Sequence, residues 1–275
     1  MSTLITKHRD GFAPGFTPVT TAGEADADTG ISMGVLRLAA GGRHTVTLPG
    51  ETAFLLMDGR IAGRAGDLAF ELARQSLFDD SPACVHAPAG TPVEICALSD
   101  AELTMYACDN ASPFAPRVFR PSDVEDERRG AGQVGDRCLR LVRTIFDARN
   151  SPPEVHLVLG EVVTLPGGWS SYPPHHHPQP EIYHYRFTHP QGFGHAELGD
   201  QVFKVRQYDT IKIMAGNDHA QCAAPGYGMY YSWVIRHLPG QPYDVPEFTA
   251  EHVWTMQPGA QYWEPSSDRK PTNKR

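Results

Sequence analysis

Three consecutive histidines mark the most informative stretch of this chain, PPHHHPQPE at residues 173–181. Side chains alternate along a strand, so His175 and His177 point to the same side, about 6.6 Å apart. Glu181 supplies a carboxylate four residues after His177, and His219 can complete the group. Three imidazoles and one carboxylate suit Zn, Mn, Fe, Co or Ni. The stretch therefore predicts a metal site on β-strands, with positions open for water or substrate.

Short apolar runs separated by glycine and proline make up most of the remaining sequence. GVLRL at 34–38 and AFLLM at 53–57 are examples, each followed by a turn signal. Such runs, repeated at intervals of roughly ten residues, are typical of an antiparallel sandwich or barrel. Residues 67–77 have helical composition but lie among these runs, and we interpret them as a strand.

A distant repeat indicates two copies of one β-barrel unit. VHAPAGTPVEI at 85–95 and IKIMAGNDH at 211–219 share an outline, and Gly216 lies 126 residues after Gly90. In this register Val93 occupies the position of His219, and no His-x-His precedes Val93 at the matching distance. We expect the first copy to have kept the scaffold and lost the ligands.

The repeat and the composition divide the chain into five expected parts. We predict an irregular N-terminal arm at 1–30, a metal-free barrel domain at 31–120 and a charged linker at 121–136, opening with a turn capped by Ser122. A metal-binding barrel domain at 137–255 and a tail at 256–275 follow, the tail being polar and disordered from Ser266 onward.

Charge and hydropathy exclude several classes of partner. The formal net charge is −8 and the pI is near 5.9, whereas nucleic acids and anionic membranes require clustered Lys and Arg. No apolar run is long enough to span a membrane, and residues 1–8 lack the apolar core of a signal peptide. Five cysteines without a CxxC pair fit reduced thiols. We expect a cytoplasmic protein.

Strand alternation also sorts the neighbours of the proposed ligands. If Glu181 faces the barrel interior, Tyr183 and Tyr185 face it too, whereas His184 faces outward. The same rule turns His176 away from the metal. We interpret His176 and His184 as surface or second-layer residues.

Three further residues are candidates for binding a substrate. Lys204 and Arg206 share one face of a predicted strand, and an arginine can bind a carboxylate through two hydrogen bonds. A solvated outer face is the alternative for both. Tyr231 and Trp233 share a face, with Tyr230 opposite, and barrel packing also explains these aromatics.

Two spacings resemble the motifs of the cupin superfamily. His175-x-His177-x3-Glu181 is similar to the first cupin motif, and Asp209-x4-Met214-Ala-Gly-x2-His219 is similar to the second. The resemblance implies a cupin barrel around the proposed metal.

Longer stretches resemble one family, the 5-deoxy-glucuronate isomerases of myo-inositol catabolism, related to the 4-deoxy-5-ketouronate isomerases of pectin breakdown. They are GWSSYPPHHH at 168–177, EIYHYRF at 181–187, PQGF at 190–193 and PGYGMYY at 225–231. The resemblance implies an all-β bicupin with two antiparallel jelly-roll barrels. It also implies a divalent metal on His175, His177, Glu181 and His219.

The reaction that the resemblance implies is an aldose–ketose isomerisation of a deoxy uronic acid, 5-deoxy-glucuronate to 2-deoxy-5-keto-gluconate. Zn or Mn is the expected metal, with Fe, Co or Ni as alternatives. Metal-bound hydroxide, Tyr183 or Tyr185 is the candidate base. The partner expected is a small sugar acid, and a homo-oligomer is left open. Two other functions remain: a metal-dependent cupin dioxygenase, and a non-catalytic bicupin that binds sugar acids.

Overall fold

Strands dominate the fold in the computed structural model, which describes residues 3–266. The first half contains β1 Leu4–Ile5, β2 Gly15–Thr20, β3 Ile31–Leu38, β4 Arg43–Thr47, β5 Glu51–Ala65, β6 Leu68–Arg74, β7 Cys84–Ala87, β8 Pro92–Ala97, β9 Ala101–Cys108 and β10 Arg117–Phe119. The second half contains β11 Glu127–Arg129, β12 Arg140–Phe146, β13 Leu157–Thr164, β14 Trp169–His176, β15 Glu181–Phe187, β16 Phe193–Leu198, β17 Gln201–Arg206, β18 Thr210–Ile213, β19 His219–Ala223, β20 Met229–Arg236 and β21 Glu247–Phe248. Short 3₁₀ helices are η1 Pro121–Asp123 and η2 Ala250–Met256.

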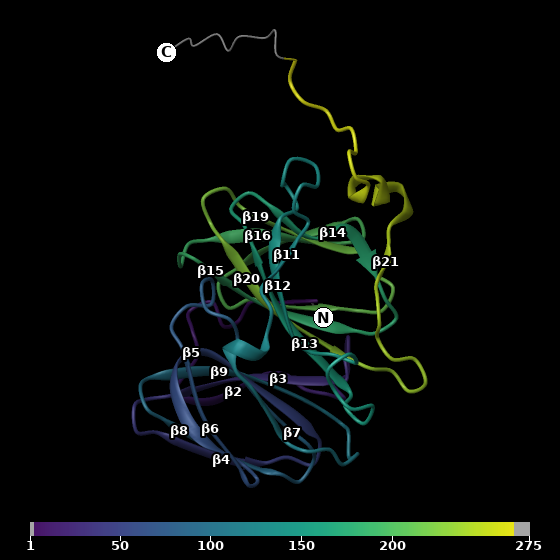
Figure 1. Ribbon diagram of the computed structural model, residues 1–275. Coiled ribbons are helices and arrows are strands. Elements are labelled where there is room, and N and C mark those ends of the chain that lie inside the picture. The colour runs from purple at the N-terminus through teal and green to yellow at the C-terminus, as the bar shows by residue number, and fades with distance from the viewer. Residues whose placement is uncertain (1–2, 267–275) are drawn as a thin grey trace.

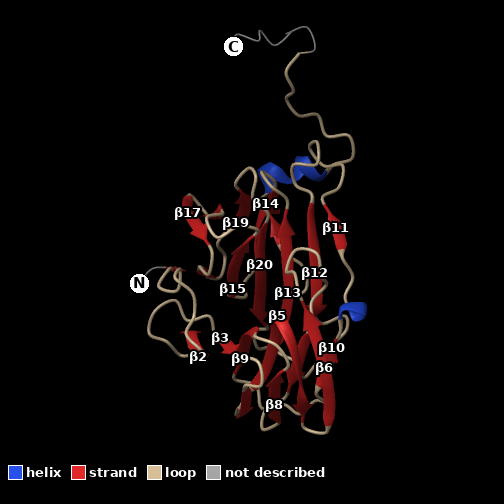
Figure 2. Cartoon of the chain, turned by 90° about the vertical axis from the view of Figure 1, so that its left-hand side faces the viewer, coloured by secondary structure: helices blue, strands red, loops and turns tan. Residues whose placement is uncertain are grey.

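The two halves of the chain form barrels that lie one above the other (Figures 1 and 2), and a sheet of each barrel contributes to the apolar contact between them. The first is a nine-stranded sheet with the order β10-β7-β5-β9-β3-β2, and its strands β4, β6 and β8 join through the long β5. In the second, a seven-stranded sheet, β1-β18-β15-β20-β13-β12-β11, packs on a five-stranded sheet, β17-β16-β19-β14-β21. Apolar side chains from both of these sheets share one core cluster. The all-β, antiparallel fold predicted from the sequence is confirmed.

The strand order of the first half recurs in the second. The path β7-β5-β9-β3-β2 corresponds to β18-β15-β20-β13-β12. In both halves the turn after the first strand of this path, β7 or β18, contains a glycine with positive φ. The angle is 73° at Gly90 and 75° at Gly216. A left-handed conformation there explains why both copies keep glycine at this point.

Buried polar contacts join the two barrels. Arg74 of β6 and Glu161 of β13 form an ion pair of 2.6 Å with both side chains fully buried. Glu51 of β5 accepts hydrogen bonds from the backbone N–H groups of His156 and Leu157 at 2.7 and 3.0 Å. The barrels are therefore held together by specific bonds and by a shared apolar cluster.

Two segments that were expected to be irregular contain regular structure. The predicted arm at 1–30 holds β1, which pairs with β18 of the second barrel, and β2, which pairs with β3 of the first. The predicted linker holds η1, whose N-cap is Arg120 and not Ser122, and β11, which pairs with β12. Each of these strands extends the edge of a sheet, and such pairing between distant segments has no local sequence signal.

Two other expectations concern residues 67–77 and the tail. Residues 68–74 form β6, which confirms the strand interpretation. Of the tail predicted to be disordered, residues 267–275 lie outside the described part of the chain. Within residues 3–266, no helix has the length and apolar character needed to cross a membrane.

Candidate metal centre and active site

Three strands bring the predicted ligands together at one end of the second barrel. His175 of β14 lies directly opposite His219 of β19 in the strand register. Glu181 is the first residue of β15, and His177 follows the end of β14. His177, Glu181 and His219 are buried, whereas His175 is half-buried.

The donor atoms of three residues form a compact group. Glu181 Oε1 lies 2.8 Å from His219 Nε2 and 3.4 Å from His177 Nε2. Potential ligand atoms of these three residues all lie within 4.8 Å of one another. His175 stands beside the group, with its ring centroid 4.4 Å from that of His219. The structure thus places all four predicted ligands together, with His175 at the margin.

Backbone carbonyls orient the three imidazoles. Each ring turns its Nδ1 towards a carbonyl oxygen two residues away, which can only accept a hydrogen bond. The contacts are His177 to Gln179 at 2.7 Å, His219 to Asn217 at 3.0 Å and His175 to Pro173 at 3.4 Å. A hydrogen on Nδ1 leaves the Nε2 lone pair free, which is the arrangement that a metal-binding histidine adopts.

Electrostatics keep the carboxylate charged despite its burial. Burial alone would raise the pKa of Glu181, but the adjacent His219 and His177 hold it well below its usual range. Burial and the nearby His219 lower the pKa of His175 to about 3, so this ring is neutral at pH 7. Burial would also lower the pKa of His177, yet Glu181 raises it above its ordinary value.

Two buried atoms of the group lack hydrogen-bond partners among the described residues. They are Glu181 Oε1 and His219 Nε2. With a hydrogen on Nδ1, His219 presents the lone pair of its Nε2 to the carboxylate oxygen 2.8 Å away. Two facing lone pairs in a buried site are costly, and a cation bound by both removes that cost. The residues present therefore fit a divalent metal ion.

Three hydroxyl groups converge beside the cluster. Tyr183 stacks on Tyr231 with ring centroids 4.5 Å apart, and its ring lies 5.9 Å from that of His219. Ser171 Oγ lies 3.5 Å from the Tyr183 hydroxyl and 3.1 Å from the Tyr231 hydroxyl. Ser171 has φ of 51°, an uncommon left-handed conformation for a residue with a side chain. The sequence interpretation missed Ser171, because backbone conformation at a serine has no local signature.

The predicted inward tyrosines are buried neutral phenols. Burial raises the pKa of Tyr183 and Tyr185 well above the ordinary value and that of Tyr231 to about 12. Tyr185 donates a hydrogen bond of 2.7 Å to Gln221 Oε1, so its hydroxyl is already engaged. Tyr183 is consequently the inward tyrosine with the less committed hydroxyl next to the cluster.

Lys204 and Arg206 do not reach the site. Both side chains are exposed on β17, whereas Val205 between them is buried in the barrel core. Lys204 Nζ instead lies over the Phe193 ring, 4.0 Å from its centroid. The substrate-binding role predicted for the two cations does not fit this placement, because both point out of the barrel.

The other histidines of the region turn away from the cluster, as alternation predicts. His176 Nδ1 lies 2.6 Å from Asp218 Oδ1 at the surface. His184 is fully buried, with Nδ1 2.8 Å from Thr210 Oγ1, on the face of β15 that packs against the first barrel. The outward face of β15 is therefore an interface between barrels.

One residue near the cluster comes from the irregular segment after β20. Tyr243 places its ring 5.0 Å from that of His177. A hydrogen bond of 2.8 Å from Gln179 Nε2 to the Gln241 carbonyl oxygen fixes the segment beside the cluster. The sequence interpretation missed Tyr243, because the segment has no strand periodicity.

The equivalent positions of the first barrel lack metal donors. Val46 pairs with Val93 in the register that His175 and His219 share in the second barrel. Together with Leu48 and Thr52, these valines line a small, closed apolar cavity. The lining of this cavity offers two threonine hydroxyls, of Thr52 and Thr91, and no imidazole or carboxylate.

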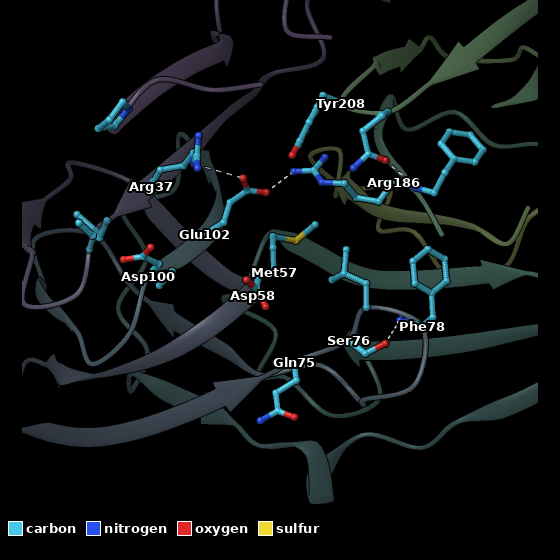
Figure 3. A pocket seen from close by; sticks show the side chains of 17 residues that line it. Arg37, Met57, Asp58, Gln75, Ser76, Phe78, Asp100, Glu102, Arg186 and Tyr208 are labelled. Atoms are coloured by element: carbon cyan, nitrogen blue, oxygen red, sulfur yellow. Dashed lines mark hydrogen bonds and ion pairs between the residues drawn. The ribbon is translucent and has the colours of Figure 1, made fainter. Parts of the chain in front are cut away.

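A large cavity of about 520 Å³ lies away from the cluster, between the two barrels (Figure 3). In its wall Glu102 of β9 accepts from Arg186 of β15 at 2.5 Å and lies 3.8 Å from Arg37 of β3. None of the four predicted metal ligands lines this cavity. It belongs to the contact between barrels.

Comparison with known proteins agrees with this geometry. The model of the KduI/IolB family matches residues 4–255. A relative from Geobacillus kaustophilus (strain HTA426), named 5-deoxy-glucuronate isomerase, is 30% identical over 201 residues, covering 67% of this chain and 69% of the relative.

Two solved structures share the fold. An IolB-like protein from Salmonella typhimurium LT2 is 24% identical, with a TM-score of 0.76 over 89% of this chain and 100% of the other. A cupin 2 conserved barrel domain protein from Leptotrichia buccalis is 12% identical, with a TM-score of 0.53 over 85% of this chain and 95% of the other. The fold is a bicupin, and the chain belongs to the KduI/IolB family.

Proposed function

We propose that this protein is a metal-dependent aldose–ketose isomerase that converts 5-deoxy-glucuronate to 2-deoxy-5-keto-gluconate. His175, His177, Glu181 and His219 would hold the divalent ion, with Zn or Mn favoured by the donor set. The observation that carries the proposal is the pair of buried, unpartnered atoms, Glu181 Oε1 and His219 Nε2, among carbonyl-oriented imidazoles. The isomerase names of the relatives support the reaction and the substrate.

The difficult step of such an isomerisation is the removal of a proton from the carbon next to a carbonyl. When bound, the metal supplies a Lewis acid for the carbonyl and neighbouring hydroxyl oxygens, and this stabilises the negative charge that develops on them. The proton must then return to the former carbonyl carbon.

The chain's own residues can hold and deliver protons at this point. Tyr183 keeps its proton because burial, and then Glu181, raise its pKa. It can therefore donate a hydrogen bond or a proton to a substrate oxygen, and Tyr231 and Ser171 hold its ring and hydroxyl in place. A phenol with a raised pKa is better suited as a proton donor than as the base.

The test combines metal analysis with NMR of 5-deoxy-glucuronate incubated with the purified protein. We expect stoichiometric metal and conversion to the ketose in the wild-type protein. His177→Ala and His219→Ala should lose both, whereas the control His176→Ala, in the adjacent surface pair with Asp218, should keep both.

Three outcomes would overturn the proposal. Retention of the metal in both cluster variants would refute the ligand assignment. Oxygen uptake in place of isomer formation by the metal-loaded protein would favour a dioxygenase, and tight sugar-acid binding without turnover would favour a binding protein.

A further inference from the structure

A smaller cavity lies beside the metal cluster. It has a volume of about 260 Å³ and runs between the β11–β12 edge of the seven-stranded sheet and the segment after β20. Its walls include Arg129, Thr144, Trp233 and Tyr243. These residues offer a cation, two hydroxyls and a broad aromatic surface, a combination that suits a small polar ligand with an apolar face.

Two of these wall residues connect the cavity to the cluster. The Tyr243 ring lies 5.0 Å from that of His177. Trp233 lies directly opposite Tyr183 in the strand register. Tyr243, which lines the cavity and contacts His177, therefore lies between the cavity and the cluster.

The charges of the cavity single out Arg129. Its Nε and Nη2 donate to Glu127 at 2.9 and 2.7 Å, and Glu127 does not line the cavity. Both side chains of this pair are about half exposed, at 45% and 51%, and an exposed pair of this kind is weak. Two acidic residues, Asp147 and Asp244, also line the cavity. Asp147 forms an ion pair of 2.7 Å with Arg149. A ligand carboxylate can replace Glu127 on Arg129 at little cost.

We propose that this cavity receives the sugar acid, with the carboxylate on Arg129 and the opposite end directed past Tyr243 to the cluster. This inference rests on the proposed function and adds the place and the direction of substrate binding. A bidentate arginine–carboxylate pair fixes orientation as well as affinity, so it would present the carbonyl end of the molecule to the metal ligands.

Steady-state kinetics on the metal-loaded protein test the role of Arg129. Arg129→Met should raise KM about 10- to 100-fold, because a charge-assisted bidentate bond is lost, with a much smaller change in kcat. Arg129→Lys should lie between, since lysine keeps the charge but not the fork. Glu127→Gln frees Arg129 and should lower KM by about two- to fivefold. The control Arg60→Met removes another exposed arginine that is paired with a glutamate, Glu71 on the neighbouring strand of the first barrel, and should change nothing.

Calorimetric binding of glucuronate and of neutral glucose separates the two proposals. We expect glucuronate to bind the wild-type protein more tightly than glucose, and Arg129→Met to abolish the difference. Unchanged KM and unchanged glucuronate affinity in Arg129→Met would overturn the pocket assignment and leave the isomerase proposal standing. Glucuronate binding that depends on Arg129 but leads to no turnover would support the pocket assignment and overturn the isomerase proposal. Failure of the wild-type protein to bind glucuronate better than glucose would also overturn the pocket assignment.

Discussion

Glu181 is the centre of the candidate site because one of its oxygens lies within 3.4 Å of two imidazole nitrogens. A buried carboxylate is costly unless cations or hydrogen bonds compensate it. The lone pairs of His219 and Glu181 face one another, so in this cluster a bound cation is the natural compensation. The carbonyl oxygens behind the rings then decide which nitrogen is offered to it.

Tyr183 and Tyr185 are expected to differ although both point inward. Tyr183→Phe should lower kcat about 100-fold, because it removes a proton donor next to the cluster. Tyr185→Phe should stay within about tenfold, since its hydroxyl serves Gln221. Steady-state kinetics with metal content measured in parallel decides the matter, and equal effects of the two variants would contradict the assignment.

Among the elements, β15 shows how one strand serves two interfaces. Its inward residues Glu181, Tyr183 and Tyr185 build the site, whereas Ile182 and His184 are fully buried on the other face. Alternation predicted the two directions correctly. It did not predict that the outward face is covered, because the covering residues come from the first barrel and the N-terminal segment.

In β13, which lies on the other side of β20, a glycine makes room for Trp233, one wall of the adjoining cavity. The Trp233 indole packs over Gly160, where an added Cβ would lie 2.3 Å from the Trp233 ring and 2.9 Å from the Arg143 carbonyl oxygen. Gly160→Ala should therefore displace the indole and lower the free energy of unfolding by about 2 kcal/mol. Urea unfolding and tryptophan fluorescence measure the two effects. Gly199→Ala serves as the control for packing, because Gly199 lies in an exposed turn and nothing is near the added Cβ. Gly199 has a positive φ, so any loss of stability in this control comes from the backbone conformation and not from a steric clash. Unchanged stability and fluorescence in Gly160→Ala would contradict this packing.

At the scale of the whole molecule, buried charges hold the barrels together. Glu161 accepts from Arg74 at 2.6 Å, from Arg143 at 3.1 Å and from the Tyr230 hydroxyl at 2.8 Å. Arg74 belongs to the first barrel and the others to the second. The network therefore depends on the correct docking of the two halves.

Glu161→Gln should destabilise the protein strongly. The change leaves Arg74 buried without a carboxylate, and breaking a buried pair costs about 3 to 5 kcal/mol. Glu71→Gln, which breaks the exposed pair with Arg60, should cost less than about 1 kcal/mol. Chemical unfolding compares the two variants, and similar losses in both would show that the buried network adds no specific stability.

Glu51 predicts a pH dependence of stability. Burial alone would raise its pKa, but hydrogen bonds from His86, Asn110 and the His156 N–H hold it below the ordinary value of 4.5. A carboxyl group whose pKa is lower in the folded than in the unfolded protein stabilises the fold at pH values above its ordinary pKa. This contribution is lost as the pH falls from the ordinary pKa through the lower pKa of the folded state.

The variant Glu51→Gln should accordingly be less stable at neutral pH by about 3 kcal/mol and should lose less stability on acidification. Unfolding curves between about pH 6 and about pH 3 measure the difference from wild type. A constant difference across this range would mean that Glu51 does not contribute through its ionisation.

Local signals in the sequence were enough to predict most strands of this protein and its candidate metal ligands. Period-two alternation placed His175 and His177 on one side, and turn glycines such as Gly90 and Gly216 indicated two copies of one barrel. These signals are local, because backbone conformation and side-chain direction in a strand depend on near neighbours.

Only the tertiary structure decided what surrounds the ligands. It brought Ser171 and Tyr243 next to the cluster, turned Lys204 and Arg206 outward, and placed Arg129 at the adjoining cavity. It also made β1 and β2 into sheet edges where an irregular arm was expected. The reason is physical: each of these placements depends on pairing or packing between segments far apart in the chain, which no single stretch of sequence encodes.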